Sequence, residues 1–231
     1  MEEALRIGIF GDSLMKATLP DDSLRYHFHQ EILDPFLAHV RGDVVNKAKF
    51  GATIRKGKAI LQKELNSGRH YDYALLEYGG NDCNHDWPDV AEHPDGDHFP
   101  VVSLQEFTDT LREMIDQLQQ AGVQPILMTL PPIDSEKYLN FLNTKGSDRS
   151  ALLHWLHDAN HIYRTQELYS NAVYKLAAQL GLPCIDVRAA FLQQPDFTKL
   201  ISEDGIHPSA EGYKLLYATL IDSVKKVQAL F

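Results

Sequence analysis

Short apolar runs alternate with helix-like segments along the whole chain. Five runs have the length and composition of buried strands, and they lie at residues 6–10, 44–45 with their neighbours, 73–78, 125–130 and 184–187. They are mostly apolar rather than strictly alternating, which is typical of parallel strands covered on both faces. Between them, apolar residues recur at spacings of three and four. Two such series are Leu104, Phe107, Leu111, Met114, Ile115 and Leu118, and Tyr213, Leu216, Leu220, Val224 and Val227. This alternation predicts an α/β fold with right-handed crossovers, a three-layer α/β/α sandwich.

The composition favours one globular domain spanning residues 1–231. A chain of 231 residues with 44% hydrophobic residues can bury a core without disulfides or metals. Its 22 Lys and Arg against 32 Asp and Glu give a net charge of −10. This charge disfavours nucleic acid as a partner, because phosphate neutralisation needs basic residues. No apolar stretch approaches the length of a membrane-spanning helix.

The chain is expected to be cytoplasmic. Its N-terminus, Met1-Glu2-Glu3-Ala4, is acidic and leads directly into the first apolar run, so no signal peptide is expected. Cys83 and Cys184 lie in unrelated apolar settings. Reduced thiols are the preferred interpretation, with a single disulfide as the alternative.

Several polar blocks follow the predicted strands. Gly11-Asp12-Ser13-Leu14 comes directly after the first strand, Gly51 follows the second, and Gly79-Gly80-Asn81-Asp82 follows the third. Asp204-Gly205-Ile206-His207-Pro208 lies just ahead of the last helical series. Ligands of open α/β sheets bind at the carboxyl ends of the strands. These blocks are therefore expected to converge on one crevice.

The residue types in these blocks suit nucleophilic catalysis. The Ser13 hydroxyl is a weak nucleophile that needs a general base, which His207 can supply. Asp204, three residues before His207, can hold the other ring nitrogen. An oxyanion would meet the backbone N–H groups of Ser13 and Gly51 and the side-chain amide of Asn81. A plain helix cap is the alternative role of Ser13, and a turn glycine that of Gly51.

These blocks, in this order, resemble the GDSL/SGNH hydrolase family. The resemblance covers nearly the whole chain and implies a flavodoxin-like parallel five-stranded sheet of order 2-1-3-4-5. It implies a serine esterase or lipase that cleaves carboxylic esters through an acyl-enzyme intermediate. The implied triad is Ser13, Asp204 and His207, and the implied oxyanion hole is Ser13, Gly51 and Asn81. No metal or organic cofactor is expected, and the partner is a small-molecule ester, with a homo-oligomer possible.

Other functions stay open beside this one. The same triad can cleave thioesters, deacetylate sugars or hydrolyse lysophospholipids. From a different class, the crevice would bind a small anion or nucleotide without chemistry, as other flavodoxin-like domains do. The acidic loops and the lack of a glycine-rich phosphate loop disfavour that alternative.

Two segments exceed the minimal strand–helix pattern. Residues 84–103 and 133–161 are expected to be long loop insertions above the strand ends, where loops often form binding sites or lids. The second contributes to an apolar set that lines an acyl pocket or lid, packs onto the body, or makes a dimer contact. Its members are Leu152, Leu153, Trp155, Leu156, Ile162 and Tyr163.

The remaining polar residues are interpreted structurally. The spacing of His85, Asp86, His93, Asp95, Asp97 and His98 matches no metal-ligand motif, so no metal site is predicted. Asp12 and Asp82 are expected to accept backbone hydrogen bonds beside tight turns. Asp186 and Arg188 are interpreted as an ion pair or turn, and Cys83 as a small buried hydrophobe. Glu77 lies in a strand that should be buried, and the sequence leaves its role open.

Overall fold

A central parallel sheet organises the molecule. The computed structural model describes residues 5–40 and 42–228. The sheet strands are β1 (Arg6–Phe10), β4 (Asp43–Asn46), β5 (Tyr73–Leu76), β6 (Gln124–Met128) and β7 (Cys184–Ile185). Their order is β4-β1-β5-β6-β7, and all neighbours are parallel. This confirms the expected 2-1-3-4-5 order. The third and fourth predicted runs extend beyond β5 and β6, because their last two residues leave the sheet and begin the strand-end loops.

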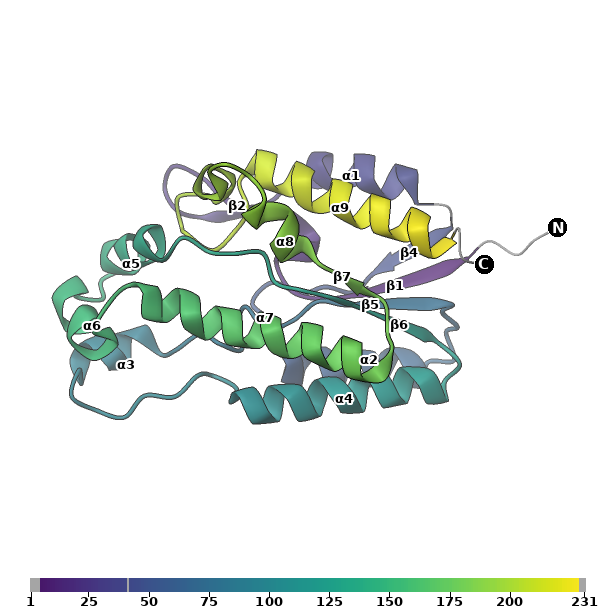
Figure 1. Cartoon of the computed structure of the whole chain (residues 1–231), viewed down its shortest axis with the longest axis horizontal. Helices are drawn as coiled ribbons and strands as arrows, with labels where there is room; N and C mark the ends of the chain where they lie inside the picture. Colours follow the sequence, from purple (N-terminus) through teal and green to yellow (C-terminus); the bar gives the residue numbers. More distant parts are fainter. Residues whose placement is uncertain (1–4, 41, 229–231) are drawn as a thin grey trace.

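Helices cover both faces of this sheet, so the three-layer prediction is confirmed. One face carries α1 (Gln30–His39), α8 (Val187–Leu192) and α9 (Ala210–Gln228). The other carries α2 (Ile54–Asn66), α4 (Leu104–Gln120) and α7 (Asn160–Leu180). Figure 1 shows the two helical layers on either side of the strands. Each layer buries its own apolar cluster against the sheet.

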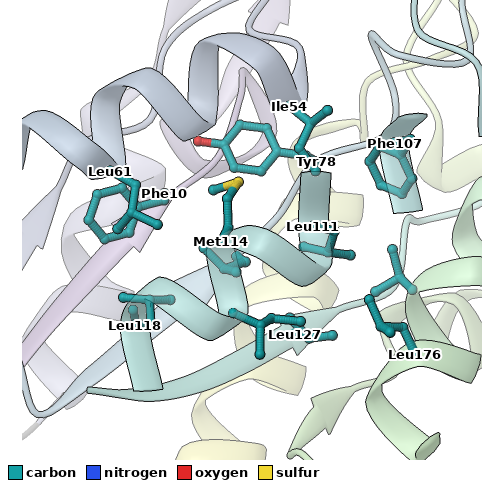
Figure 2. Packing of buried hydrophobic residues seen from close by; sticks show 14 of the residues in the cluster. Phe10, Ile54, Leu61, Tyr78, Phe107, Leu111, Met114, Leu118, Leu127 and Leu176 are labelled. Carbon is teal, nitrogen blue, oxygen red and sulfur yellow. The ribbon is translucent and has the colours of Figure 1, made fainter. Parts of the chain in front are cut away.

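The cluster beneath α2, α4 and α7 has the periodicity that the sequence predicts. Phe107, Leu111, Met114 and Leu118 of α4 are at most 3% exposed and point inward together (Figure 2). Burying a side chain of this kind contributes about 1.5–3 kcal/mol relative to leaving it exposed. Ser103 caps the start of α4 by accepting a hydrogen bond from the Glu106 N–H. This helix therefore has both the buried apolar face that the sequence predicts and a capping residue at its N-terminus.

Helix α9 makes two hydrogen bonds to the segment that follows β1. Tyr213, with Leu216 and Leu220, is buried as predicted, whereas the side chains of Val224 and Val227 lie outside the described part of the chain. The Tyr213 hydroxyl donates to the Thr18 carbonyl, and the Tyr217 hydroxyl donates to the Leu14 carbonyl. The last helix thus fixes the backbone directly after Ser13.

A small antiparallel hairpin follows β1 and was not predicted. The one-turn helix η1 (Leu14–Lys16) leads into β2 (Thr18–Pro20) and β3 (Tyr26–Phe28). Strands of three residues carry too few side chains for an alternating pattern to be recognised. The hairpin brings Tyr26 next to the strand ends of the main sheet.

The expected long loops at 84–103 and 133–161 are largely helical, which corrects that prediction. The first contains α3 (Trp87–Glu92), and the second contains α5 (Ser135–Thr144) and α6 (Arg149–Leu156). Asp86, Asp134 and Asp148 each cap one of these helices by accepting a backbone N–H. The helices are too short to show a clear apolar period, so the aspartates at their N-termini were the only strong local signal in the sequence. We call these three helices the cap.

The cap packs around an apolar cluster of its own at the end of the molecule opposite the described chain ends (Figure 1). A second one-turn helix, η2 (Phe197–Leu200), precedes α9. No helix in residues 5–40 and 42–228 is both long and apolar enough to cross a bilayer. The assignment of residues 1–231 to one domain stays a prediction.

Candidate active site

Ser13 lies where β1 ends and η1 begins. Its side chain is 6% exposed and makes no capping hydrogen bond, although Ser13 occupies the N-cap position of η1. Asp12 shapes this turn, because its Oδ1 accepts the Leu14 N–H at 2.9 Å. The capping alternative for the Ser13 side chain is therefore not what the geometry shows. Its hydroxyl faces His207 instead.

Ser13, His207 and Asp204 form a continuous hydrogen-bonded chain. Ser13 Oγ lies 2.8 Å from His207 Nε2, and His207 Nδ1 lies 2.6 Å from Asp204 Oδ2. All three residues are buried. Residues 194 positions apart in the chain thus meet at one atom pair. The arrangement can move a proton from the serine hydroxyl to an imidazole whose other nitrogen is held by a carboxylate.

Asp204 is held ionised by its own loop. Its Oδ1 accepts the Ser202 hydroxyl at 2.7 Å and the N–H groups of Ile206 and His207, both at 3.0 Å. Burial alone would raise the pKa of Asp204, but the hydrogen bond and charge of His207 outweigh burial and lower this pKa to about 2. An ionised Asp204 keeps the proton on His207 Nδ1, which leaves the lone pair of Nε2 facing Ser13.

The tight loop that carries Asp204 and His207 requires glycine at position 205. Gly205 has a φ of +78°, and a Cβ there would lie 2.2 Å from the backbone nitrogen of Tyr138 in α5. The backbone of this loop therefore packs closely against α5 of the cap. The Asp134 N–H donates to the Gly205 carbonyl at 2.8 Å, which fastens the same contact.

Two backbone N–H groups and one side-chain amide come from residues that line the cavity at Ser13. Ser13, Gly51 and Asn81 all line the same cavity. Within residues 5–40 and 42–228, neither the Ser13 N–H nor the Gly51 N–H donates a hydrogen bond. Gly51 has a φ of +67° and open space around the position of a Cβ, so its backbone is accessible from the cavity. Two unoccupied donors are therefore available to an oxyanion.

Asn81 differs from these two donors, because its amide is already engaged. Its Nδ2 donates to Asp12 Oδ2 at 2.8 Å and, over a longer 3.2 Å, to the carbonyl of Ala52. Asp12 and Asp82 both accept backbone N–H groups, as the sequence predicts for them. Sequence reasoning did not predict that Asp12 would also hold Asn81.

Glu77 belongs to the same buried group of acids. It is fully buried, its Oε2 accepts the Asp12 N–H at 3.1 Å, and its Oε1 has no hydrogen-bond partner among the described residues. Burial and the charge of Asp12 raise the pKa of Glu77 well above its usual range. Burial also raises the pKa of Asp82, to about 7. The sequence left the role of Glu77 open. The structure shows that its side chain is buried and contacts the backbone of Asp12, next to Ser13.

The cavity above Ser13 has a volume of about 420 Å³. Its apolar walls come partly from the cap and the start of α7, including Tyr138, Leu156 and Ile162. Leu156 and Ile162 also belong to the apolar cluster of the cap, whereas Leu153, Trp155 and Tyr163 only pack against it. The pocket and packing interpretations of this segment therefore both hold for Leu156 and Ile162, whereas the dimer contact stays a prediction.

Three aromatic side chains at the cavity were missed by sequence reasoning. The Tyr26 ring centroid lies 5.0 Å from that of His207, and Phe50 stacks on His207 at 6.5 Å. Phe141 of α5 lies 6.4 Å from Tyr26. Phe50 directly precedes Gly51, which was the one available signal; Tyr26 and Phe141 lie in segments whose structure was not predicted. Phe50 is 46% exposed, so these rings form an aromatic rim.

The side chains of the His- and Asp-rich segment pair with neighbouring residues. In the described part of the chain, no group of three or more His, Cys, Asp or Glu side chains is placed to hold a metal ion. His93 and His98 pair with Asp89, and His154 pairs with Asp95. His85 packs between Trp87 and Trp155. Burial, with the charges of His161 and His98, lowers the pKa of His85 to about 4. The absence of a cofactor stays a prediction.

Asp186 and Arg188 do not pair with each other among the described salt bridges, so the ion-pair interpretation is wrong. Asp186 caps α8 by accepting the Ala189 N–H at 3.1 Å. Arg188 donates to Gln166 Oε1 at 2.8 Å and stacks over the ring of Tyr163. Cys83 is buried as expected, its thiol donates to the Gly80 carbonyl, and burial raises the pKa of that thiol.

Known proteins are similar in sequence to this chain over most of its length. The Saccharomyces cerevisiae isoamyl acetate-hydrolyzing esterase is 24% identical over 226 residues, covering 94% of this chain and 84% of the relative. The Arabidopsis thaliana GDSL esterase/lipase CPRD49 is 28% identical over 192 residues, covering 81% of this chain and 68% of the relative.

Solved structures share the fold over nearly the whole chain. A lipase/acylhydrolase from Enterococcus faecalis superposes with a TM-score of 0.66 at 21% identity, covering 96% of both chains. An acetylxylan esterase from Geobacillus stearothermophilus superposes with a TM-score of 0.63 at 20% identity, covering 96% of this chain and 94% of that one. The profile of the GDSL-like lipase/acylhydrolase family matches residues 9–215. Because this match spans most of the sequence, the chain belongs to the GDSL-like lipase/acylhydrolase family.

Proposed function

We propose that the chain hydrolyses carboxylic esters through an acyl-enzyme intermediate, with Ser13 as nucleophile, His207 as general base and acid, and Asp204 as the group that orients His207. The hydrogen-bonded chain from Ser13 Oγ to His207 Nε2 (2.8 Å) and from His207 Nδ1 to Asp204 Oδ2 (2.6 Å) carries the proposal. Family membership and the ester-hydrolysing relatives support the same reaction class.

In the first half of the reaction, His207 Nε2 takes the Ser13 proton while Oγ attacks the ester carbonyl carbon. The carbonyl oxygen becomes an oxyanion beside the N–H groups of Ser13 and Gly51 and the Asn81 amide. The intermediate then collapses, the bond to the alcohol oxygen breaks, and His207 returns its proton to that oxygen. In the second half, His207 takes a proton from water, hydroxide attacks the acyl-enzyme, and Ser13 leaves with the proton.

Replacing Ser13 tests this function directly. Ser13→Ala is expected to lower the turnover of p-nitrophenyl acetate on the order of 10⁴-fold or more, because the nucleophile is lost. The matched control is Ser67→Ala, since the Ser67 hydroxyl donates to the Glu64 carbonyl at the end of α2, outside the cavity. Unchanged turnover in folded Ser13→Ala would contradict the proposal.

Covalent labelling gives a second, independent readout. A fluorophosphonate probe is expected to attach to Ser13, as located by peptide mass spectrometry, and to leave Ser13→Ala unlabelled. Labelling at another residue would assign the nucleophile elsewhere. A lack of labelling together with tight binding of phosphate or flavin would favour the non-catalytic binding function instead.

The class of ester is a matter for a substrate panel. The apolar walls of the cavity suit an acyl or alcohol group of moderate size. The panel runs p-nitrophenyl esters of increasing chain length beside acetylated xylo-oligosaccharides, an acyl thioester and a lysophospholipid. A preference for the thioester or the lysophospholipid would replace the carboxylic-ester assignment by the thioesterase or lysophospholipase function.

We also propose that the chain works in the cytoplasm. Cys83 and Cys184 are both free thiols in the described structure, which supports a reducing compartment. Fractionation of cells that express the tagged chain tests the location. A homo-oligomer stays a prediction, to be measured by size-exclusion chromatography with light scattering.

A further inference from the structure

Glu77 is a fully buried acid that the proposed reaction steps do not use. It follows β5 directly, and its side chain is 0% exposed. Its Oε2 accepts the Asp12 N–H at 3.1 Å, whereas its Oε1 has no hydrogen-bond partner in the described part of the chain. A buried ionised carboxylate without a cation or several donors is costly by several kcal/mol. Glu77 is therefore expected to be neutral.

The donors around Glu77 and Asp12 indicate which of the two carries the proton. Asp12 accepts two hydrogen bonds through its carboxylate, from the Leu14 N–H at 2.9 Å and the Asn81 amide at 2.8 Å. Glu77 accepts one, from the Asp12 backbone. Because hydrogen-bond donors stabilise the charged form, the charge belongs on Asp12 and the proton on Glu77. A protonated Glu77, whose Oε2 already accepts the Asp12 N–H, has an O–H with which to donate to the neighbouring Asp12 carboxylate.

The close approach of these groups is built into the backbone. A Cβ at position 11 would lie 2.8 Å from Glu77 Oε2, so Gly11 makes room for the acid. Glycine at position 80 leaves the Asp12 carboxylate near the backbone of the next strand-end loop, 3.7 Å from the position of a Cβ. The two acids are thus packed in place between the strand-end segments that carry Ser13 and Asn81.

Asn81 depends on Asp12 for its orientation. Its amide nitrogen donates over 2.8 Å to charged Asp12 and over a longer 3.2 Å to the neutral carbonyl of Ala52. Bonds to a charged acceptor are about twice as strong as bonds between neutral groups. An oxyanion would therefore compete with Ala52 for the second N–H while Asp12 keeps the first.

We propose that Glu77 is a positioning residue that stays protonated and, through its hydrogen bond to Asp12, holds the Asn81 amide in place for the oxyanion. The proposal rests on the proposed function and deepens it, since it adds a second layer to the oxyanion site. If Glu77 carried a charge, two negative groups would lie beside the developing oxyanion and oppose it.

Three variants at two positions test this role. Glu77→Gln keeps a donor for the Asp12 carboxylate and an acceptor for the Asp12 N–H, so kcat is expected to stay within about 3-fold of the native value. Glu77→Leu removes both, and Asp12→Asn removes the charged acceptor of Asn81. Both are expected to lower kcat on the order of 10- to 100-fold with little change in KM, because loss of one oxyanion donor costs on the order of 100- to 1000-fold.

The comparison between the Glu77 variants is the decisive one. A kcat of Glu77→Gln as low as that of Glu77→Leu would overturn the proposal, since a charge rather than a proton would then be required. A folded Glu77→Leu with native kcat would also overturn it. Should Glu77→Leu fail to fold, native-like kcat in Glu77→Gln together with the loss in Asp12→Asn supports the role, and any other result rejects it.

A spectroscopic readout separates positioning from mere structural support. At pH 7 the infrared difference spectrum between the native protein and Glu77→Gln is expected to contain a protonated-carboxyl band from Glu77, in addition to the band that Asp82 contributes to both proteins. A protonated-carboxyl band of equal intensity in the two proteins would overturn the proposal. Failure of the proposed function would appear differently, as native activity in Ser13→Ala, whereas failure of this inference leaves Ser13 labelling intact.

Discussion

Buried carboxylates lie on both sides of Ser13, and their surroundings differ sharply. Asp204, on the side of the base, and Asp82, on the side of the oxyanion donors, are both 0% exposed. Asp204 accepts hydrogen bonds on both oxygens, including three on Oδ1. Asp82 accepts the Ile54 N–H on Oδ1, and its Oδ2 has no partner among the described residues. The pKa of Asp204 is lowered to about 2, whereas burial raises that of Asp82 to about 7.

This contrast teaches that burial does not by itself decide the charge of an acid. Desolvation raises the pKa of both groups, and only the number of donors and the nearby His207 reverse that direction for Asp204. The oxyanion side has fewer donors and neighbouring acids, so protons are retained there. The site therefore keeps its negative charge beside the imidazole, where it is useful, and limits it where an oxyanion would form.

The largest expected effect comes from neutralising the acid on the base side. Asp204→Asn is expected to lower kcat on the order of 10⁴-fold, because the wrong tautomer of His207 then faces Ser13. Steady-state kinetics with p-nitrophenyl acetate measure it. A loss below about 10-fold would mean that Asp204 is not the group that orients His207, and the two sides would then not differ in function.

The oxyanion side is expected to make stability depend on pH above pH 4. The folded pKa of Asp82, about 7, exceeds its ordinary value of 3.8, so the folded state binds this proton more tightly. Its contribution is fully present below pH 3.8 and is lost as pH rises through 7, by up to about 4 kcal/mol. Urea unfolding at several pH values between 4 and 8 measures the slope.

Asp82→Asn is the matched variant for this slope. Asn keeps an oxygen for the Ile54 N–H but cannot titrate, so the decline in stability between pH 4 and 7 should become shallower. A residual decline is expected from Asp12 and Glu77, whose pKa values are raised by burial in the same direction. An unchanged slope in Asp82→Asn would show that Asp82 is ionised at neutral pH despite its burial.

The base side is expected to act in a separate and lower pH window. The folded pKa of Asp204, about 2, lies below its ordinary 3.8. Its contribution is present above pH 3.8 and is lost as pH falls through 2, by about 2 kcal/mol. Thermal melts of Asp204→Asn should therefore flatten the acid limb and leave the slope between pH 4 and 7 intact. If Asp204→Asn instead changed the slope between pH 4 and 7, the acids on the base side and those on the oxyanion side would not affect stability in separate pH ranges.

The smallest expected effect tests whether a single hydrogen-bond donor to the buried Asp204 carboxylate adds measurable stability. Ser202→Ala removes one hydrogen bond to Asp204, formed at 2.7 Å, and is expected to reduce stability above pH 4 by about 1 kcal/mol. Ser23→Ala is the matched control, because Ser23 makes the same hydroxyl–carboxylate bond to exposed Asp21 and should show no measurable change. Equal effects in the two variants would argue against burial as the factor that makes donors count.

Much of the fold followed from local patterns. The strand order, the two helical layers and the inward face of α4 agree with the prediction, because apolar runs and periodic helices are properties of neighbouring residues. The cap helices α3, α5 and α6 were expected as loops, since helices of six to ten residues show little periodicity. The three-residue strands β2 and β3 were missed for the same reason.

The candidate site divides in the same way. Ser13, Gly51, Asn81 and His207 were named from the sequence, and the structure places them around one cavity; Asp204 contacts His207 behind it. Their catalytic roles stay predictions. The engagement of Asn81 by Asp12 was not predicted, because it joins residues 69 positions apart and depends on how two strand ends lie together.

By itself, the sequence determines that a serine follows the first strand and that an aspartate and a histidine share one short loop. Those features are local: the donors to Asp204 all come from residues 202–207. Only the tertiary structure decides which acids keep their protons. The pKa of Glu77 is raised by burial and by the charges of Asp12 and Asp82, which lie on different strand-end loops, so no local pattern contains this effect.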